Sequence, residues 1–443
     1  MRRLQLLAIG MCLIWAVPAE ARQWPHWRGP AASGVSPERG LPTQWSDSDN
    51  IAWKAAIRGL GISSPIVSGD LVIVTSQAGS GEVRPGPRLV QGGNPAEAGE
   101  RALGAVSPKP TGEGGKVVFL VSAFDRRSGG KKWEYELPAE GDLTAVHEKH
   151  NLASPSPVAD GERIYAWFGT GQVAAIDTSG KLVWKKHLGA EYGPFVINWG
   201  HGSSPVVHNG QLLLLCYHEK SSYLLALDAK TGAVRWKSDA PAGVTSYSTP
   251  LVVESGGKTE IVVNSSAGIS GHDFATGART WYFDEANRFP IPTPLVQDGV
   301  IYASRGYRSS PVVAIRAGGS GDIAASRVVW RMPSGAPYIS SPIHHEGLIY
   351  MTGDVGVLTV CDAKTGERVY QERVGGVFTA SPVAGDGKVY LVSEDGETIV
   401  LRAGRTPTIL SRNRLAARQL ASPAIAGGRL FIRSDDVLYA IGK

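Results

Sequence analysis

Short apolar runs separated by turn residues recur along almost the whole chain, and they open in the same way. A proline preceded by Ser or Thr begins a stretch of strand-type sequence such as SPVAGDGKVYLV or TPLVQDGVIYAS. The intervals between these prolines are 92, 48, 45, 44, 48, 40 and 41 residues, for Pro65, Pro157, Pro205, Pro250, Pro294, Pro342, Pro382 and Pro423. A period in the forties with strand-type sequence in each unit predicts a β-propeller with one repeat per blade.

Residues 205–236 show how one repeat predicts four strands. Residues 206–207 predict an inner strand, and the Asn-Gly pair that follows is a two-residue hairpin signal. Residues 212–217 are apolar enough for a second strand buried on both faces, and residues 224–227 predict a third. An Asp-Ala-Lys-Thr-Gly turn comes next, because Asp caps turns and Gly readily adopts a positive φ. A fourth strand begins at Val234.

An aromatic residue marks the fourth strand of most repeats. We expect these side chains to pack between neighbouring blades, where each buries on the order of 200 Å². They are Trp53, Trp133, Trp184, Trp236, Trp281, Trp330 and Tyr370. The fifth repeat keeps Trp330 but replaces the usual turn with AGGSGDIAAS.

The two ends of the chain together predict how the ring closes. The last repeat, from Pro423, ends after three strands, and a strand around Trp53 stands before the first repeat. The sequence therefore predicts an all-β fold, an eight-bladed β-propeller of four-stranded antiparallel blades closed by the N-terminal strand. Such closure removes an open sheet edge.

Residues 1–21 have the parts of an export signal: a basic pair, an apolar run and an Ala-Glu-Ala cleavage pattern. The apolar run is short for a membrane span. We therefore expect cleavage after Ala21, a periplasmic or secreted protein, and no stable membrane insertion. A leader segment at 22–49 then precedes the propeller at 50–443.

Residues 77–116 form an insertion in the first blade, between its second and third strands. Ten Gly and five Pro in forty positions cannot bury a core, which predicts an exposed, flexible loop. A lid over the channel is an alternative for this segment.

Composition and charge exclude some partners. The formal net charge is +5 without a Lys/Arg cluster, so nucleic acid is not an expected partner. Cys216 and Cys361 lie in apolar strands of different repeats, where they are expected to be small buried residues and not a disulfide. We expect a monomer.

The chain resembles the propellers built of pyrroloquinoline quinone (PQQ)-type repeats. The resemblance covers residues 50–443, and its Ala-x-Asp-x-x-x-Gly-x-x-x-Trp motif is complete at 123–133 and 226–236. Two kinds of protein share that fold, the PQQ-dependent alcohol dehydrogenases and the non-enzymatic assembly lipoproteins of BamB type. The opening WPHWRGPAASGVSPERGLPTQW, residues 24–45, resembles the leader of exported bacterial PQQ-binding-like propellers.

The loops that lead into the inner strands gather at one mouth of a propeller's channel, the default ligand site. Here they carry the candidate binding residues His147, His150, Asn151, Asn198, Trp199, His201, Tyr247, Arg288, Phe289, Tyr338, Phe378 and Arg418. The segment around Tyr307 is a further candidate. Because it follows a second strand, the sequence does not decide whether it lies at this mouth or on the opposite face of the propeller. Acidic residues are scarce in these loops, where Glu148 and Glu191 are the nearest.

These side chains allow more than one chemistry. His147, His150 and His201 are a possible metal set or hydrogen-bonded loop residues. The aromatic side chains could stack on a planar cofactor or a sugar, or pack against the channel wall. Two arginines, Arg288 and Arg418, could neutralise an anionic ligand or be solvated.

The resemblance also implies what a dehydrogenase would require: a vicinal cysteine disulfide, Ca²⁺ held by Glu and Asn, and an Asp base. The sequence has no adjacent cysteines. We therefore interpret the chain as a non-catalytic binding or assembly scaffold of the bacterial cell envelope, with an envelope protein or small ligand at the mouth. The alternatives are a PQQ- or metal-dependent oxidoreductase and a carbohydrate-binding propeller.

Overall fold

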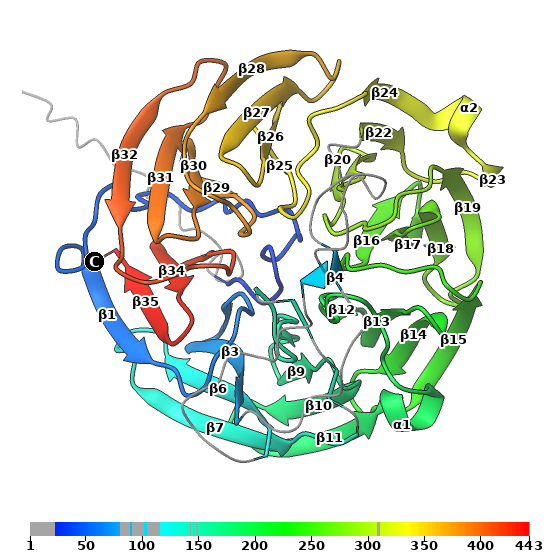
Figure 1. Cartoon of the computed structure of the whole chain (residues 1–443), viewed down its shortest axis with the longest axis horizontal. Coiled ribbons are helices and arrows are strands. Elements are labelled where there is room, and N and C mark those ends of the chain that lie inside the picture. Colours follow the sequence, from blue (N-terminus) through cyan, green and yellow to red (C-terminus); the bar gives the residue numbers. More distant parts are fainter. Residues whose placement is uncertain are drawn as a thin grey trace, which may run out of the picture.

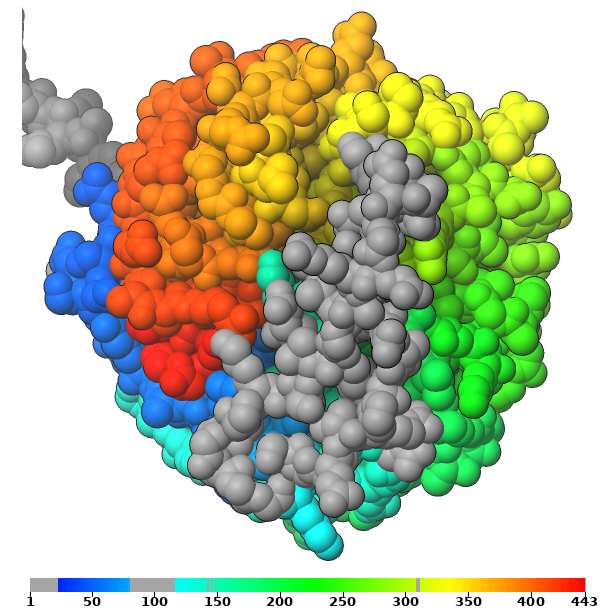
Figure 2. All heavy atoms as spheres, viewed as in Figure 1, coloured from blue at the N-terminus to red at the C-terminus, as the bar shows by residue number. Residues whose placement is uncertain are grey.

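Eight four-stranded antiparallel units form a closed ring in the computed structural model (Figure 1). The structure describes residues 23–79, 116–141, 143–144, 146–147, 149–307 and 311–442, together with the backbone at 89–90 and 102–103. The blades follow one another around the disc (Figure 2). The eight-bladed all-β fold predicted from the repeats is confirmed.

Each inner strand starts directly after the proline of its repeat. Blade 1 contains β2 (Ile66–Ser68), β3 (Leu71–Ala78), β6 (Val118–Asp125) and β7 (Lys131–Pro138), and blade 2 contains β8 (Val158–Ala159), β9 (Arg163–Trp167), β10 (Gln172–Asp177) and β11 (Leu182–His187). Blade 3 contains β12 (Val206–His208), β13 (Gln211–Tyr217), β14 (Ser222–Asp228) and β15 (Val234–Ala240). Blade 4 contains β16 (Leu251–Ser255), β17 (Lys258–Asn264), β18 (Gly268–Asp273) and β19 (Arg279–Asp284). A short helix, α1 (Leu188–Tyr192), follows β11.

Blades 5 to 8 repeat the plan. Blade 5 contains β20 (Leu295–Gln297), β21 (Val300–Ser304), β22 (Val312–Arg316) and β24 (Val328–Met332), and blade 6 contains β25 (Ile343–His345), β26 (Leu348–Thr352), β27 (Val357–Asp362) and β28 (Arg368–Arg373). Blade 7 contains β29 (Val383–Gly385), β30 (Lys388–Val392), β31 (Glu397–Arg402) and β32 (Ile409–Arg414). Blade 8 contains β33 (Ala424–Ala426), β34 (Arg429–Arg433), β35 (Val437–Ile441) and β1 (Ile51–Ala56). Between β22 and β24 lie β23 (Gly321–Asp322), which pairs in parallel with β19, and α2 (Ala324–Arg327).

The eighth blade joins the two ends of the chain, as the sequence predicts. Antiparallel pairing of β1 with β35 places Lys54 opposite Tyr439 and Ala55 opposite Leu438. The C-terminal strands thus acquire their outer partner from the N-terminal side of the propeller.

The Ser or Thr before each proline forms a belt around the channel. The backbone N–H of each donates to the hydroxyl of its counterpart in the next blade at 2.9–3.1 Å, and the last bond returns to the first blade. The members are Ser64, Ser156, Ser204, Thr249, Thr293, Ser341, Ser381 and Ser422. A hydroxyl at this position satisfies a buried backbone donor of the neighbouring blade, which is why the repeat requires Ser or Thr there.

The leader crosses the face on which the first two strands of each blade are joined, here called the hairpin face. Trp24 pairs through its backbone with Val67 of blade 1, at 2.9 and 2.8 Å. Further along, Val35 pairs with Ala384 of blade 7, and the Glu38 carboxylate accepts from backbone N–H groups at 427–428 of blade 8. The leader passes behind the centre of the ring in Figure 1.

Arg28 projects from the leader into the interior of the ring. Its side chain is 2% exposed, and its guanidinium donates to the carbonyls of Thr293 (3.4 Å), Ser33 (3.1 Å) and Pro342. Burial lowers the pKa of Arg28 to about 9. Thr293 belongs to the belt, so the Arg28 side chain anchors the leader deep in the channel, from the end that opens on the hairpin face.

Several predictions on the N-terminal part concern residues outside the described ones. The export signal at 1–21 lies there entirely. Most of the 77–116 insertion does too, except for its first residues, Lys116 and the paired strands β4 (Leu89–Val90) and β5 (Ala102–Leu103). Its flexibility and its role as a lid stay predictions.

Candidate functional site

Two sets of loops share the face opposite the hairpin face, here called the mouth. Because blade strands alternate in direction, loops that enter the inner strands lie beside loops that join second and third strands. Phe289 enters blade 5 and Tyr307 follows β21, yet their rings are 5.1 Å apart. The segment around Tyr307 therefore lies on the same face as the predicted site.

Five aromatic side chains form a continuous arc over blades 3 to 6. Phe289 lies at its centre, with ring centroids 6.1 Å from Trp199 and 6.4 Å from Tyr247. Tyr307 continues the arc to Tyr338, at 5.3 Å. All five rings are partly exposed, so this aromatic arc offers faces and edges for stacking.

Local contacts hold the arc in place. The Tyr247 hydroxyl donates to the carbonyl of Asn198 at 2.6 Å, and the Arg288 guanidinium lies 5.1 Å above the Phe289 ring. The Trp199 backbone has φ 77°, a left-handed conformation that is uncommon for a bulky side chain. Strained backbone of this kind concentrates at functional sites.

The mouth also contains an ion pair between distant blades. Lys149, which leads into blade 2, donates to Glu394 of blade 7 at 2.9 Å. The Thr379 hydroxyl donates to the same carboxylate oxygen at 2.6 Å. Asp354 of blade 6 belongs to this group as well, and burial raises its pKa to about 6.

The expectation of few acidic residues concerned only the loops before the prolines. Asp354 and Glu394 reach the mouth from loops that join second and third strands, which that expectation did not consider. Those loops contain the Asp-Val-Gly and Glu-Asp-Gly sequences of blades 6 and 7. Applying strand alternation to the sequence would have assigned them to the mouth.

Three histidines lie buried below the arc. Neither ring nitrogen of His218 has a hydrogen-bond partner among the described residues, while His150 and His201 interact with the backbone of Asn151 and Ser203. Burial lowers the pKa of His150 and of His218 to about 3, and it holds that of His201 well below its usual value. The His201 ring packs 4.1 Å from Trp167, so the imidazoles are neutral core side chains.

The possible metal set of His147, His150 and His201 makes other contacts in the structure. His147 lies with its ring 5.2 Å from Trp199, and its Nδ1 accepts from the backbone of Lys149. Within the described part of the chain, no group of three or more His, Cys, Asp or Glu side chains is arranged to hold a metal ion.

The remaining candidates have structural contacts. Asn151 binds backbone groups of Leu60 and Ala153, Phe378 is fully buried, and Arg418 pairs with Asp435 at 3.0 Å. Cys216 and Cys361 are buried and unpaired, as expected from the sequence.

Comparison with known proteins places this fold in a family. The family model described as outer membrane protein assembly factor BamB matches residues 117–324 and 321–406, which together are well over half of the chain. The chain belongs to this BamB family. It is accordingly a BamB-like propeller of PQQ-type repeats.

Individual relatives are distant from this BamB-family propeller. Tetrathionate hydrolase of Acidithiobacillus ferrooxidans is 24% identical over 65% of this chain and 57% of its own length. The BamB protein of Yersinia pestis is 23% identical over 71% of this chain and 66% of its own. The matched parts thus span less than two thirds of these relatives.

Solved structures confirm the architecture. A europium-containing methanol dehydrogenase superposes with a TM-score of 0.67 at 12% identity, covering 96% of this chain and 98% of the other. At that identity the likeness shows the fold alone. Among the described residues, no helix is long and apolar enough to cross a membrane.

Proposed function

We propose that this propeller is an exported, non-catalytic binding or assembly scaffold of the bacterial envelope that docks a partner protein at its mouth. The observation that carries the proposal is the aromatic arc, because partly exposed aromatic rings are typical anchors of protein interfaces. Relatives named as outer membrane protein assembly factors support an envelope role. The export signal expected at 1–21 accords with a periplasmic or secreted location.

The two faces of the disc differ in a way that favours the mouth. On the hairpin face, the leader already occupies the end of the channel through Arg28. On the mouth, Val355 and Val377 are 66% and 45% exposed beside the loops of blades 6 and 7. Exposed apolar side chains next to an aromatic surface favour a macromolecular contact there.

Photo-crosslinking in the producing cells tests the docking site. A photoreactive amino acid replaces Val377 at the mouth or, as a matched control, Val183 on the outer strand of blade 2, which is also 45% exposed. We expect one discrete adduct from position 377, absent from position 183 and lost with Trp199→Ala and Tyr338→Ala. Identical adducts at both positions, or none at 377, would contradict docking at the mouth.

A carbohydrate ligand is a second candidate, because the arc presents ring faces next to the polar group of Lys149, Thr379 and Glu394. The carboxylates of PQQ would need cations. Lys149 is paired with Glu394 and Arg418 with Asp435, which leaves the exposed Arg288 beside Phe289 as the candidate cation of the arc.

Thermal unfolding separates these ligands. The protein is heated alone, with PQQ and Ca²⁺, with Zn²⁺, and with envelope glycan fragments. A ligand at 100 times its Kd stabilises the fold by about 2.7 kcal/mol, which raises Tm measurably. A shift with glycan alone supports the second candidate, and a shift with PQQ would support the oxidoreductase alternative instead.

A further inference from the structure

The junction between blades 4 and 5 is built differently from four others. At Trp53, Trp133, Trp184 and Trp330, the indole N–H donates to a turn carbonyl of the next blade at 2.8–3.0 Å. Blade 5 has AGGSGDIAAS in place of that turn, and this segment forms β23 and part of α2. The Trp281 indole donates instead to Glu260 of its own blade, at 3.4 Å.

A glycine allows Trp281 to lie in this position. The residue opposite the aromatic side chain is Ala123, Ala175, Ala226, Ala314 or Val360 in five other blades, and Gly271 in blade 4. A Cβ on Gly271 would lie 2.1 Å from the Trp281 indole, so the ring rests directly on the glycine backbone. Trp281 is completely buried there.

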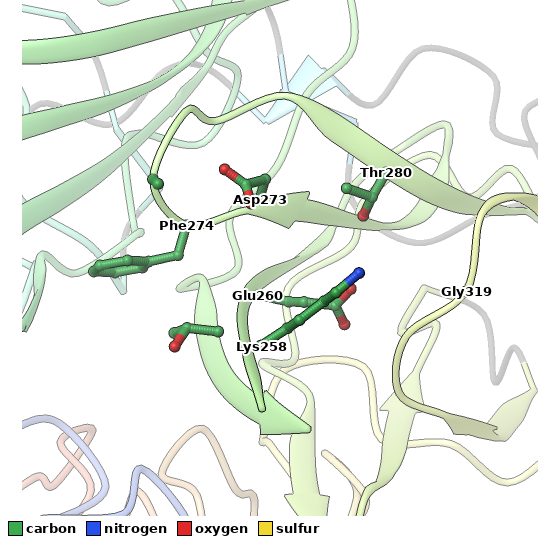
Figure 3. Close-up of a pocket in the computed structure, with 8 residues that line it drawn as sticks. Lys258, Glu260, Asp273, Phe274, Thr280 and Gly319 are labelled. Atoms are coloured by element: carbon green, nitrogen blue, oxygen red, sulfur yellow. The ribbon is translucent and has the colours of Figure 1, made fainter. Parts of the chain in front are cut away.

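This altered junction contains a pocket of about 350 Å³ on the hairpin face, away from the mouth. Figure 3 shows the side chains around it, from the start of β17, the β18–β19 connection and the blade 5 segment. They include Lys258, Glu260, Asp273, Phe274, Thr280 and Gly319. The volume is at the small end of ligand pockets and suits a single side-chain head group.

The electrostatics of the pocket favour a cation. Glu260 is 6% exposed, and among the described residues its carboxylate accepts only the long hydrogen bond from the Trp281 indole, at 3.4 Å. A buried carboxylate without a cationic partner is costly, so a cation would be bound favourably. Asp273 adds a second carboxylate, and Phe274 adds an aromatic wall. The exposed Lys258 ammonium opposes this preference from a flexible stem. The Arg327 guanidinium beside Gly319 opposes it too, but it is held by a hydrogen bond to the Ala317 carbonyl at 3.1 Å.

We propose that this pocket binds the guanidinium or ammonium group of an arginine or lysine side chain of a partner protein. This inference deepens the scaffold function and rests on it, by assigning a second contact point on the hairpin face. A guanidinium makes two charge-assisted hydrogen bonds to one carboxylate, which suits Glu260. A metal ion is not the ligand we infer, because Glu260 and Asp273 do not belong to any cluster of three or more His, Cys, Asp or Glu side chains that could hold one among the described residues.

Titration with N-acetyl-arginine amide, followed by saturation-transfer NMR on the full protein, tests the pocket. The neutral analogue N-acetyl-citrulline amide has nearly the same shape without the charge. We expect the arginine compound to bind and the citrulline compound to bind at least 10-fold more weakly. Glu260→Gln should weaken arginine binding by a similar factor, whereas Glu254→Gln, an exposed carboxylate of the same blade, should not.

A second variant guards against misfolding of Glu260→Gln. Ala275 is an exposed lining residue, so Ala275→Phe fills the pocket without altering the core and should also abolish binding. The proposed site would be wrong if the arginine and citrulline compounds bound equally well, or if Glu260→Gln and Ala275→Phe both left arginine binding unchanged. Because the probe is a small molecule, this result is independent of crosslinking at the mouth, and either proposal can fail alone.

Discussion

At the scale of the residue, Gly271 offers a sharp test of the blade 4 core. In Gly271→Ala, the new methyl group would overlap the Trp281 indole, whose atoms lie 2.1 Å from the Cβ position. Overpacking of this kind costs about 1–3 kcal/mol. We expect Tm to fall, and Glu260 to lose its indole contact as Trp281 moves, which NMR of the indole N–H would show.

The reverse change in blade 3 is the matched control. Ala226 lies opposite Trp236 in the same register, and Ala226→Gly adds no atoms. Its cost should be about 0.5–1 kcal/mol of backbone entropy, plus about 0.8 kcal/mol for the buried methyl group that is lost. An unchanged indole N–H resonance of Trp281 in Gly271→Ala would show that the close approach of Trp281 is not the cause.

The buried histidines predict a loss of stability in acid. The pKa of His218 is lowered by burial to about 3 in the folded protein, below the ordinary value of 6.5. Its stabilising contribution is therefore present above pH 6.5 and is lost as the pH falls toward 3, because the unfolded chain takes the proton first. His218→Phe should flatten the decline of Tm between pH 7 and 4.5.

Asp354 should change the stability of the protein with pH in the opposite direction to His218. Its pKa is raised by burial to about 6, so the folded state binds the proton more tightly than the unfolded state. Its contribution is fully present below about pH 4 and is lost as the pH rises through 6. Asp354→Asn should therefore steepen the acid decline that His218→Phe flattens, and a change of the same sign in both variants would refute this assignment.

Single residues also show where sequence reasoning ends. The Ser/Thr-Pro pairs predicted the start of every inner strand, because proline and strand-type residues are local signals. The same residues gave no indication of the hydroxyl belt, whose bonds join positions 40 to 92 residues apart and 358 residues apart where the ring closes. Contacts of that range depend on how the ring closes, and His218 was missed for the same reason.

At the scale of the element, we expect the leader to contribute to the stability of the propeller through Arg28. Arg28→Met keeps a long side chain but leaves the carbonyls of Thr293 and Pro342 without their buried donor. Unsatisfied buried polar groups cost about 1–3 kcal/mol each. We expect a lower Tm and faster hydrogen exchange across 23–45, whereas Arg39→Met, an exposed residue of the same segment, should change neither.

The leader was recognised in the sequence as a unit, but its position was not. It has one β-bridge with blade 1 and one with blade 7, and no strand run that a pattern could detect. Its binding depends on single side chains such as Arg28 and Glu38, which reach partners hundreds of residues away. The strands were predictable because their periodic apolar pattern is a property of the local sequence.

At the scale of the whole molecule, the two faces carry different chemistry. The mouth presents aromatic rings and an ion pair between distant blades, whereas the hairpin face holds the leader and the Glu260 pocket. The repeats are nearly alike inside and differ at their loops and at one junction. The two proposed sites do not overlap, so the proposed scaffold function predicts that one partner can contact both faces at once.

Because β1 closes the ring, we expect two N-terminal truncations to differ strongly in Tm. Removing residues 23–49 takes away the leader alone, whereas removing 23–57 also takes away β1 and leaves β35 with an unpaired outer edge. An open edge exposes backbone donors and acceptors and invites association between copies. We expect the longer truncation to melt much lower and to oligomerise, and a peptide of residues 50–57 to restore Tm. Equal Tm values for the two truncations would mean that β1 does not hold the ring closed.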